Sequence, residues 1–304
     1  MRYFFIFVIL LTSFVGLAQE VHPQEIHPED APRVAAPPPA AEEIIRRSLT
    51  HWRRNLDAAH NYTFQQRNVE EELNKDGSAK KTEIDTHEIL IIYGEPYEKL
   101  IAKDDKPLSE KDRQKEEEKL TKYFEKQKNR SDEDREKERA KQRDKFQREI
   151  ADELPRMLNY QIEREDNFQG RPVWVLTASP RRDYKSNSMA GKLLSKLSGR
   201  VWITKDDYEW VKAEADLADD FSVGWFLFKL HKGTHLEFEQ TRINDEVWLP
   251  KRVFIEGSGR LAVKTARFRN TTDYSNYQKF SSEHKITGFA EEEQPAAEAV
   301  HPNQ

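Results

Sequence analysis

The chain of 304 residues contains no cysteine. Disulfide bridges, thiolate metal ligands, cysteine nucleophiles and a lipid attached through cysteine are therefore excluded. The chain also lacks a basic excess, because 50 Lys and Arg against 55 Asp and Glu leave a net charge of −5. No nucleic-acid partner is expected from this balance. Disordered chains lack aromatic residues. The 11% of aromatic residues beside 35% of charged residues therefore predicts a folded core joined to a highly charged segment.

The sequence motifs of common catalytic sites are absent as well. The chain has no G-x-S-x-G, no P-loop, no G-x-G-x-x-G and no H-E-x-x-H. His231 and His235 have the spacing of a metal-binding pair on a helix, but Gly233 between them favours a turn. We therefore expect a protein that is not an enzyme, with no catalytic residues, no metal site and no cofactor. A hydrolase with an unrecognised site stays open as an alternative.

The N-terminus has the pattern of an export signal. Arg2 precedes an uncharged apolar run from Tyr3 to Val15, and small residues follow up to Ala18. This pattern predicts a signal peptide over residues 1–18, cleaved after Ala18. The run is shorter than the ~20 residues of a membrane-spanning helix, so export is favoured over anchoring.

Two segments of biased composition flank the central part of the chain. Residues 19–40 are rich in proline and alanine, which predicts an extended, disordered linker. Residues 289–304 have no periodic apolar positions and are predicted to form a disordered tail. Residues 41–288 are expected to fold as one domain.

Periodicity within this domain predicts one helix followed by antiparallel strands. Apolar residues recur at helical spacing from Ala41, which predicts an amphipathic N-terminal helix. Alternating residues predict strands over 62–73 and 82–93, joined by a turn at 74–77. From residue 158 onward, closely spaced turn signals predict further antiparallel strands.

A charged segment over residues 109–153 interrupts the strands. Ser109 and Ser131 are each followed three residues later by an acid, which predicts two helix starts. Between residues 125 and 145 the only aliphatic residue is Ala140, so we expect this middle part to be exposed. The segment is predicted to project as an arm or lid, or to be a solvated insertion stabilised by alternating charges.

The run from Phe221 to Leu230, FSVGWFLFKL, is apolar on both faces when it is read as a strand. Either it is a strand or short helix buried between two layers, or one side lines a cavity for an apolar ligand. Aromatic density and alternation give the candidate wall residues of such a cavity: Trp202, Trp210, Trp225, Phe226, Phe228, Leu236, Phe238, Trp248 and Phe254.

The second half of the chain resembles a known family. The segments are GRVWITKDDYEWVKAEA from Gly199, EQTRINDEVWLPKRVFIEGSG from Glu239 and TTDYSNYQKF from Thr271. Together with the order of leader, helix, strands and helical interruption, they resemble the LolA/LolB-like superfamily of periplasmic lipoprotein carriers, in particular outer-membrane lipoprotein-sorting proteins. The resemblance covers residues 42–284. The charged insertion is longer and more polar than the family's lid, and no lid-locking residue can be matched.

The resemblance implies an α+β fold in which a curved antiparallel sheet forms an unclosed half-barrel. An N-terminal helix and the charged insertion, as lid or arm, would accompany this sheet. The implied function is a periplasmic carrier or binder of lipoprotein acyl chains or other apolar cargo on the concave face. Its partners would be a lipidated protein or lipid acyl chains, and inner- and outer-membrane sorting components. The alternative is an envelope sensor or assembly scaffold that docks a protein partner with the same fold.

Overall fold

The computed structural model describes residues 39–59, 61–224, 228–262 and 264–279. The predicted signal peptide and tail lie outside these ranges, as does nearly all of the predicted linker. The helices are α2 (Ala41–Ala59), α3 (Glu110–Lys128), α4 (Asp132–Phe146), the π-helical turn η1 (Gln147–Ala151), α5 (Leu154–Met157) and α6 (Met189–Leu194). None of the helices in these ranges is long and apolar enough to cross a membrane.

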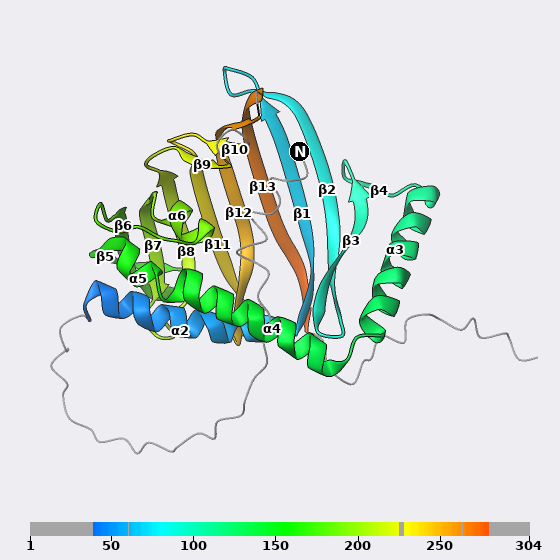
Figure 1. Cartoon of the computed structure of the whole chain (residues 1–304), viewed down its shortest axis with the longest axis horizontal. Coiled ribbons are helices and arrows are strands. Elements are labelled where there is room, and N and C mark those ends of the chain that lie inside the picture. Colours follow the sequence, from blue (N-terminus) through cyan, green and yellow to red (C-terminus); the bar gives the residue numbers. More distant parts are fainter. Residues whose placement is uncertain (1–38, 60, 225–227, 263, 280–304) are drawn as a thin grey trace, which may run out of the picture.

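The described strands form one open antiparallel sheet (Figure 1). They are β1 (Tyr62–Leu73), β2 (Ala79–Ile92), β3 (Glu95–Lys103), β4 (Lys106–Pro107), β5 (Leu158–Phe168), β6 (Arg171–Pro180), β7 (Leu197–Thr204), β8 (Trp210–Leu217), β9 (Phe221–Val223), β10 (Phe228–Leu230), β11 (His235–Ile243), β12 (Val247–Leu261) and β13 (Lys264–Lys279). The order is β4-β3-β2-β1-β13-β12-β11-β8-β7-β6-β5, and β9 and β10 form a hairpin beside β12. Because β4 and β5 do not pair, the sheet is not closed, and the predicted half-barrel is confirmed.

Helix α2 covers one face of this sheet. Its residues Ile44 and Ile45 are fully buried and pack in one cluster with Leu176 of β6 and Ile203 of β7. Burying a large aliphatic side chain contributes about 1.5–3 kcal/mol relative to leaving it exposed. We call the face that carries α2 the inner face, and the opposite one the outer face.

The strand register extends the inner face across the sheet. Directly paired residues of neighbouring strands point to the same face. Val201 belongs to the cluster under α2 and pairs with Ala213, which pairs with Phe238. Phe238 in turn pairs with Val253. The inner face therefore runs from β6 to β12 and continues onto β13 and β1.

The outer face has its own apolar cluster. Residues of β6, β7, β8 and β12 form it: Val173, Val175, Trp202, Val211 and Trp248. Cationic side chains border this cluster, because the Lys212 Nζ lies 4.8 Å from the ring centre of Trp202 and the Arg171 guanidinium 5.9 Å from that of Trp248. Both faces of β6 and β7 are thus packed.

The helical insertion connects the two edges of the open sheet. Helix α3 follows edge strand β4, and α5 leads into the other edge strand, β5 (Figure 1). Both predicted helix starts are confirmed. The Ser109 Oγ accepts a hydrogen bond from the Asp112 N–H at 3.2 Å, and the Ser131 Oγ accepts one from the Asp134 N–H at 3.0 Å.

The middle of the insertion is less exposed than its composition predicts. Arg135 is 8% exposed, lies 5.2 Å above the Tyr93 ring and donates a hydrogen bond to the Gln127 carbonyl oxygen at 2.8 Å. The rings of Tyr93 and Phe124 lie 5.4 Å apart. The prediction of exposure is therefore wrong at Gln127 and Arg135, which are both buried. The Tyr93 ring and backbone carbonyl oxygens take the place of water around the Arg135 guanidinium.

The apolar run also differs from the single strand or helix that we expected. Its ends form the short strands β9 and β10, and Gly224 between them has φ +58°, a backbone conformation that favours glycine. Residues 225–227 lie outside the described ranges.

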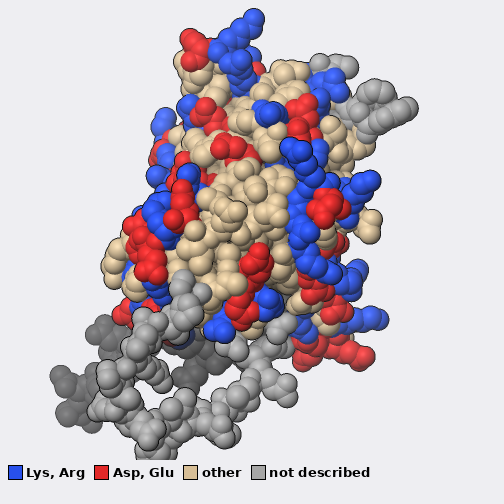
Figure 2. Space-filling view, turned by 90° about the vertical axis from the view of Figure 1, so that its left-hand side faces the viewer, with Lys and Arg blue, Asp and Glu red and all other residues tan. Residues whose placement is uncertain are grey.

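Charged side chains cover much of the molecular surface. Figure 2 views the left-hand side of Figure 1, where β5 and β6 lie, and shows charged bands on either side of an uncharged area. Many of the charges are paired, as are Arg200 and Glu163, whose Nε and Oε2 lie 2.7 Å apart.

Candidate functional site

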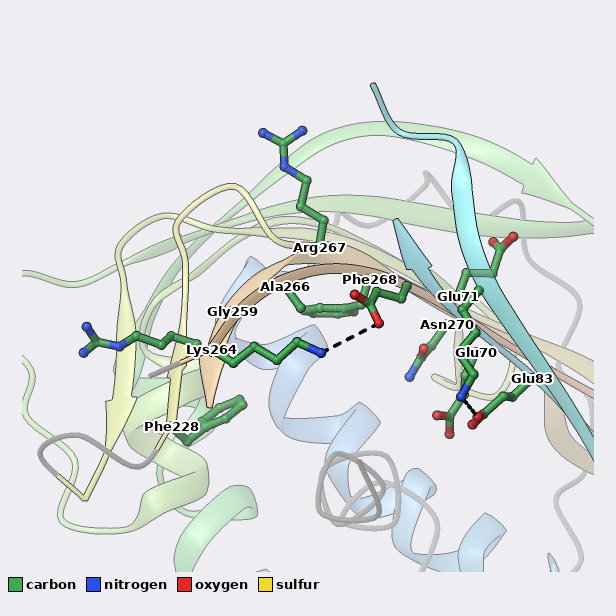
Figure 3. A pocket seen from close by; sticks show the side chains of 13 residues that line it. Glu70, Glu71, Glu83, Phe228, Gly259, Lys264, Ala266, Arg267, Phe268 and Asn270 are labelled. Carbon is green, nitrogen blue, oxygen red and sulfur yellow. Dashed lines mark hydrogen bonds and ion pairs between the residues drawn. The ribbon is translucent and has the colours of Figure 1, made fainter. Parts of the chain in front are cut away.

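Strand β1 ends and β2 begins at the end of the sheet remote from α2 (Figure 1). A pocket of about 440 Å³ lies at this end (Figure 3). Its apolar wall includes Phe228 of β10 and Phe268 and Ala266 of β13, whereas Glu70 and Glu83 stand on the other side. The pocket is therefore amphipathic: an aromatic wall faces a carboxylate wall, and cationic side chains line it as well, namely Lys81, Arg260, Lys264 and Arg267.

The aromatic wall is continuous with the inner face of the sheet. Phe228 and Phe268 are half-buried and pack against the cluster of Leu193, Leu217, Phe221 and Leu230. Phe268 also packs against the inner-face cluster that includes Leu236 and Phe238, which are likewise half-buried. An alkyl chain entering the pocket can therefore follow an apolar surface onto the inner face.

The aromatic wall depends on a close approach of β10 to β12. A Cβ atom at Gly259 would lie 2.9 Å from the Lys229 carbonyl oxygen, closer than such atoms normally come. Glycine at this position lets the β9–β10 hairpin sit against β12, where Phe228 reaches the pocket.

The carboxylate wall arises from the register of β1 with its two neighbours. Glu70 pairs with Glu83 of β2 and with Asn270 of β13. Burial, with the neighbouring carboxylates of Glu83 and Asp85, raises the pKa of Glu70 above its usual value. Glu83 bonds with Lys81 of its own strand.

Four of the sequence-predicted residues lie on the inner face. Phe228 lines the pocket, and Leu236 and Phe238 extend its apolar surface. Trp210 packs against the α2 cluster instead, and its Nε1–H donates a hydrogen bond to Ser48 Oγ at 2.6 Å. The helix therefore fills the space around Trp210.

Three other predicted residues lie on the outer face. Trp202 and Trp248 are 7% and 2% exposed in the outer cluster. Phe254 alternates with two inner-face residues of β12, and its ring centre lies 6.3 Å from that of His235. Trp225 and Phe226 lie outside the described residues.

Sequence reasoning missed the carboxylate wall and Phe268. A signal for the carboxylates was present, because the turn at 74–77 brings β1 and β2 together in a hairpin that sets Glu70 opposite Glu83. Across the described ranges, no three His, Asp or Glu side chains are arranged to hold a metal ion.

No protein-family model and no curated protein matches the chain. Several solved structures are similar to it. A DUF1329 family protein from Desulfovibrio piger is 12% identical, with a TM-score of 0.31 and coverage of 83% of this chain and 98% of that one. A LolA superfamily protein from Nitrosomonas europaea is 13% identical, with a TM-score of 0.28 and coverage of 82% and 97%. An outer membrane lipoprotein-sorting protein domain from Vibrio parahaemolyticus is 11% identical, with a TM-score of 0.30 and coverage of 83% and 95%.

The superfamily that the sequence resemblance indicated is thus named among the similar structures. Identities and TM-scores at this level carry no functional argument. The fold rests on the strand order and register described above, and the function on the chemistry of the pocket.

Proposed function

We propose that the chain is an exported carrier or binder of apolar cargo, and that it holds acyl chains of a lipoprotein or lipid on the inner face of its sheet. The observation that carries this proposal is the half-buried apolar surface that runs from Phe228 and Phe268 to Leu236 and Phe238. Each CH₂ group buried on such a surface contributes about 0.8 kcal/mol without needing a hydrogen bond. The predicted signal peptide over residues 1–18 supports a periplasmic location.

Two further features fit a carrier. The open sheet leaves part of its apolar inner face accessible, and exposed apolar surfaces of this kind mark ligand or interaction sites. The insertion from α3 to α5 connects the two sheet edges and could act as the lid. Handover to sorting components at the inner and outer membranes belongs to the same proposal.

Binding of a fluorescent fatty acid tests the proposal. Purified protein lacking residues 1–18 is titrated with cis-parinaric acid, and lipids from the same preparation are extracted for mass spectrometry. Phe228→Asp should weaken binding at least tenfold, because a carboxylate beside the alkyl chain is costly to desolvate. Phe254→Asp is the matched control, since it places the same charge at a half-buried phenylalanine of the outer face.

Urea unfolding of both variants separates loss of the pocket from loss of the fold. Binding by the wild type that Phe254→Asp leaves unchanged and Phe228→Asp removes would support the proposal. Absence of both probe binding and extracted lipid in the wild type would overturn it. An equal loss of probe binding in Phe228→Asp and Phe254→Asp, with both variants folded, would also overturn it.

The scaffold alternative places a protein partner on the charged insertion. Exposed charges of α3 are largely paired along the helix, as are Arg113 and Glu110 at 2.5 Å. Removing the insertion is a poor test, because it connects the two sheet edges. Replacing the exposed Lys122 and Lys126 with Glu changes the surface charge of α3 and keeps the connection between the sheet edges. Release of a co-purifying protein with probe binding intact would favour the scaffold.

A further inference from the structure

The end of the sheet at which the pocket lies carries a surplus of cationic side chains. Residues 73–81 close the β1–β2 hairpin and residues 259–267 close the β12–β13 hairpin, and together they contain six Lys or Arg and one acid. The chain as a whole has more acids than bases, 55 against 50. We call these two hairpin ends the cationic tip, and its six cations are Lys75, Lys80, Lys81, Arg260, Lys264 and Arg267.

The two hairpin ends lie side by side in the sheet. Leu73 of β1 pairs with Arg267 of β13, and the Arg267 guanidinium donates a hydrogen bond to the Lys75 carbonyl oxygen. The Lys264 Nζ lies 3.9 Å from Glu72 Oε2 of β1 (Figure 3). Charges from both hairpins therefore belong to one surface. All six cations except Arg260 are exposed, and Figure 3 shows Arg267 pointing away from the aromatic wall.

Part of this positive charge has no counterion in the protein. Within the described ranges, Lys75, Arg260 and Arg267 form no ion pair. Asp76, the one acid of the cationic tip, accepts hydrogen bonds from the Ser78 N–H at 3.0 Å and from the Ser78 hydroxyl at 2.6 Å. Like charges gathered in this way repel one another, so an anionic partner would stabilise them.

The carboxylates of the pocket do not cancel this surplus. The pocket contributes four Glu, and with Asp76 they make five acids against the six cations. Glu71, one of the four, pairs with Arg269 outside the cationic tip at 3.2 Å. Glu72 and Glu83 each pair with a lysine of the tip.

The turn of the β12–β13 hairpin lacks the polar residues that tight turns normally have. Between Arg260 and Lys264 the sequence contains only Leu, Ala and Val, whereas Gly, Asn, Asp and Ser dominate turns. Ala262 is exposed and has φ +51°, a conformation that glycine and asparagine adopt readily and alanine does not. The chain therefore presents an apolar residue between cations, at a position where a polar residue would be less strained.

We propose that the cationic tip docks on the surface of a membrane that contains anionic phospholipids. The cations would lie among the phosphate groups, and the turn at Ala262 would enter the membrane interface. Apolar residues flanked by Lys and Arg are typical of interfacial membrane anchors. An acidic protein would match the cations but would leave the exposed apolar turn unexplained.

The position of the pocket gives this contact a use. The pocket lies at the same end of the sheet as the cationic tip, so a docked molecule would hold its aromatic wall close to the membrane. An acyl chain would then move between the two without crossing bulk water. The docking itself does not depend on the cargo, and it therefore goes beyond the proposed function.

Sedimentation with lipid vesicles tests the proposal. The protein without residues 1–18 is mixed with vesicles of phosphatidylcholine alone, or of phosphatidylcholine with phosphatidylglycerol. Because each Lys or Arg close to an anionic surface strengthens binding about fivefold, the mixed vesicles should be bound at least tenfold more tightly. Screening by ~0.5 M NaCl should remove most of this preference.

Two lysines of the β1–β2 hairpin test the charge. The double variant Lys75→Gln with Lys80→Gln changes two exposed residues that do not line the pocket. It should bind the mixed vesicles about 25-fold more weakly than the wild type. The matched control is Lys122→Gln with Lys126→Gln, which removes the same charge from exposed positions of α3 and should bind as the wild type does.

A matched pair at Ala262 tests the turn of the other hairpin. Asn and Asp both tolerate positive φ, so neither Ala262→Asn nor Ala262→Asp strains the backbone, and the two differ by one negative charge. Ala262→Asp should bind the mixed vesicles about fivefold more weakly than Ala262→Asn.

The outcomes separate docking from cargo binding. Equal binding to the two kinds of vesicle by the wild type would overturn the docking proposal, as would equal losses in the two double lysine variants. If the wild type binds neither vesicle and the Lys75→Gln, Lys80→Gln variant releases a co-purifying acidic protein, the tip docks on a protein and the membrane proposal is wrong. Binding of cis-parinaric acid without vesicles tests the proposed function alone, and this variant should retain it.

Discussion

Glu209 is the buried carboxyl group whose titration should be easiest to detect. It is 6% exposed, and its Oε2 has no hydrogen-bond partner among the described residues. Burial raises the pKa of Glu209 to about 8, with a contribution from the Asp207 carboxylate that the Arg242 guanidinium partly offsets. The side chain is therefore mostly neutral in the folded protein at pH 7 and ionised in the unfolded chain.

This difference predicts a loss of stability with rising pH. Between the unfolded pKa near 4.5 and the folded pKa of about 8, the folded state binds more protons than the unfolded state. The free energy of unfolding should therefore fall as pH rises through this window, by about 1 kcal/mol per pH unit from this group. Glu209→Gln should remove this contribution and make the fall in stability less steep, as measured by urea unfolding at pH 5, 6.5 and 8.

The matched control for this prediction is Glu214→Gln, because Glu214 lies on neighbouring strand β8 and is more exposed. This variant should keep the wild-type slope. Parallel stability profiles for the wild type and Glu209→Gln would show that Glu209 does not titrate in this range.

At single positions, the sequence predicted which residues are apolar better than it predicted which face they occupy. Trp202 of β7 and Trp210 of β8 were both predicted to line the wall of one cavity, and so to share a face. The register shifts by one residue between Trp202 and Ile203, and such a shift reverses the face of every later side chain. Trp202 therefore lies on the outer face and Trp210 on the inner face.

At the scale of elements, Arg135 holds the two long helices of the insertion to the turn between β2 and β3. Its guanidinium donates hydrogen bonds to the carbonyl oxygens of Gln127 at 2.8 Å and Arg130 at 2.6 Å, and it stacks on Tyr93. Arg135→Ala should therefore weaken the docking of α3 and α4 by about 2–3 kcal/mol. Chymotrypsin should then cleave faster after Tyr123 and Phe124.

Arg113→Ala is the control for the docking prediction. Arg113 pairs with Glu110 on the exposed side of α3, and an exposed pair of this kind contributes little. Its cleavage rate should match that of the wild type. Equal protection of Tyr123 and Phe124 in the wild type and Arg135→Ala would mean that other contacts dock the insertion.

Elements with strong local signals were predicted, and those that depend on pairing were not. The caps at Ser109 and Ser131 are local, and both helices start where predicted. Strand β3 was not among the predicted strands, because it contains Pro96 and proline is disfavoured inside a sheet. Pro96 is instead the second residue of β3, near a strand start, where a missing N–H is tolerated.

At the scale of the whole molecule, the strand order could not be derived from local patterns. The sequence gives no measure of which strands lie at the edges, so the path of the insertion from β4 to β5 was hidden. The resemblance to a known family predicted the open sheet, because it carried long-range information that periodicity lacks. The amphipathic pocket combines β1, β2, β10, β12 and β13, and it too exists only once these strands are paired.

An open sheet leaves two edges that other chains could join, and β5 is the longer one. Unpaired backbone groups at an edge invite association, and charged side chains and bulges oppose it. Strand β5 has both devices, because Glu163, Arg164, Glu165 and Asp166 follow one another and the register shifts between Ile162 and Arg164.

Removing these charges should therefore make the protein associate. Replacing Arg164 and Asp166 with Val should produce dimers or larger species in size-exclusion chromatography with light scattering, in proportion to protein concentration. The matched control replaces Lys212 and Glu214 with Val, an oppositely charged pair with the same spacing on β8, which is paired on both sides. If both double variants stay monomeric, the charges of β5 do not protect this edge; if both associate equally, added surface apolarity rather than the free edge drives association.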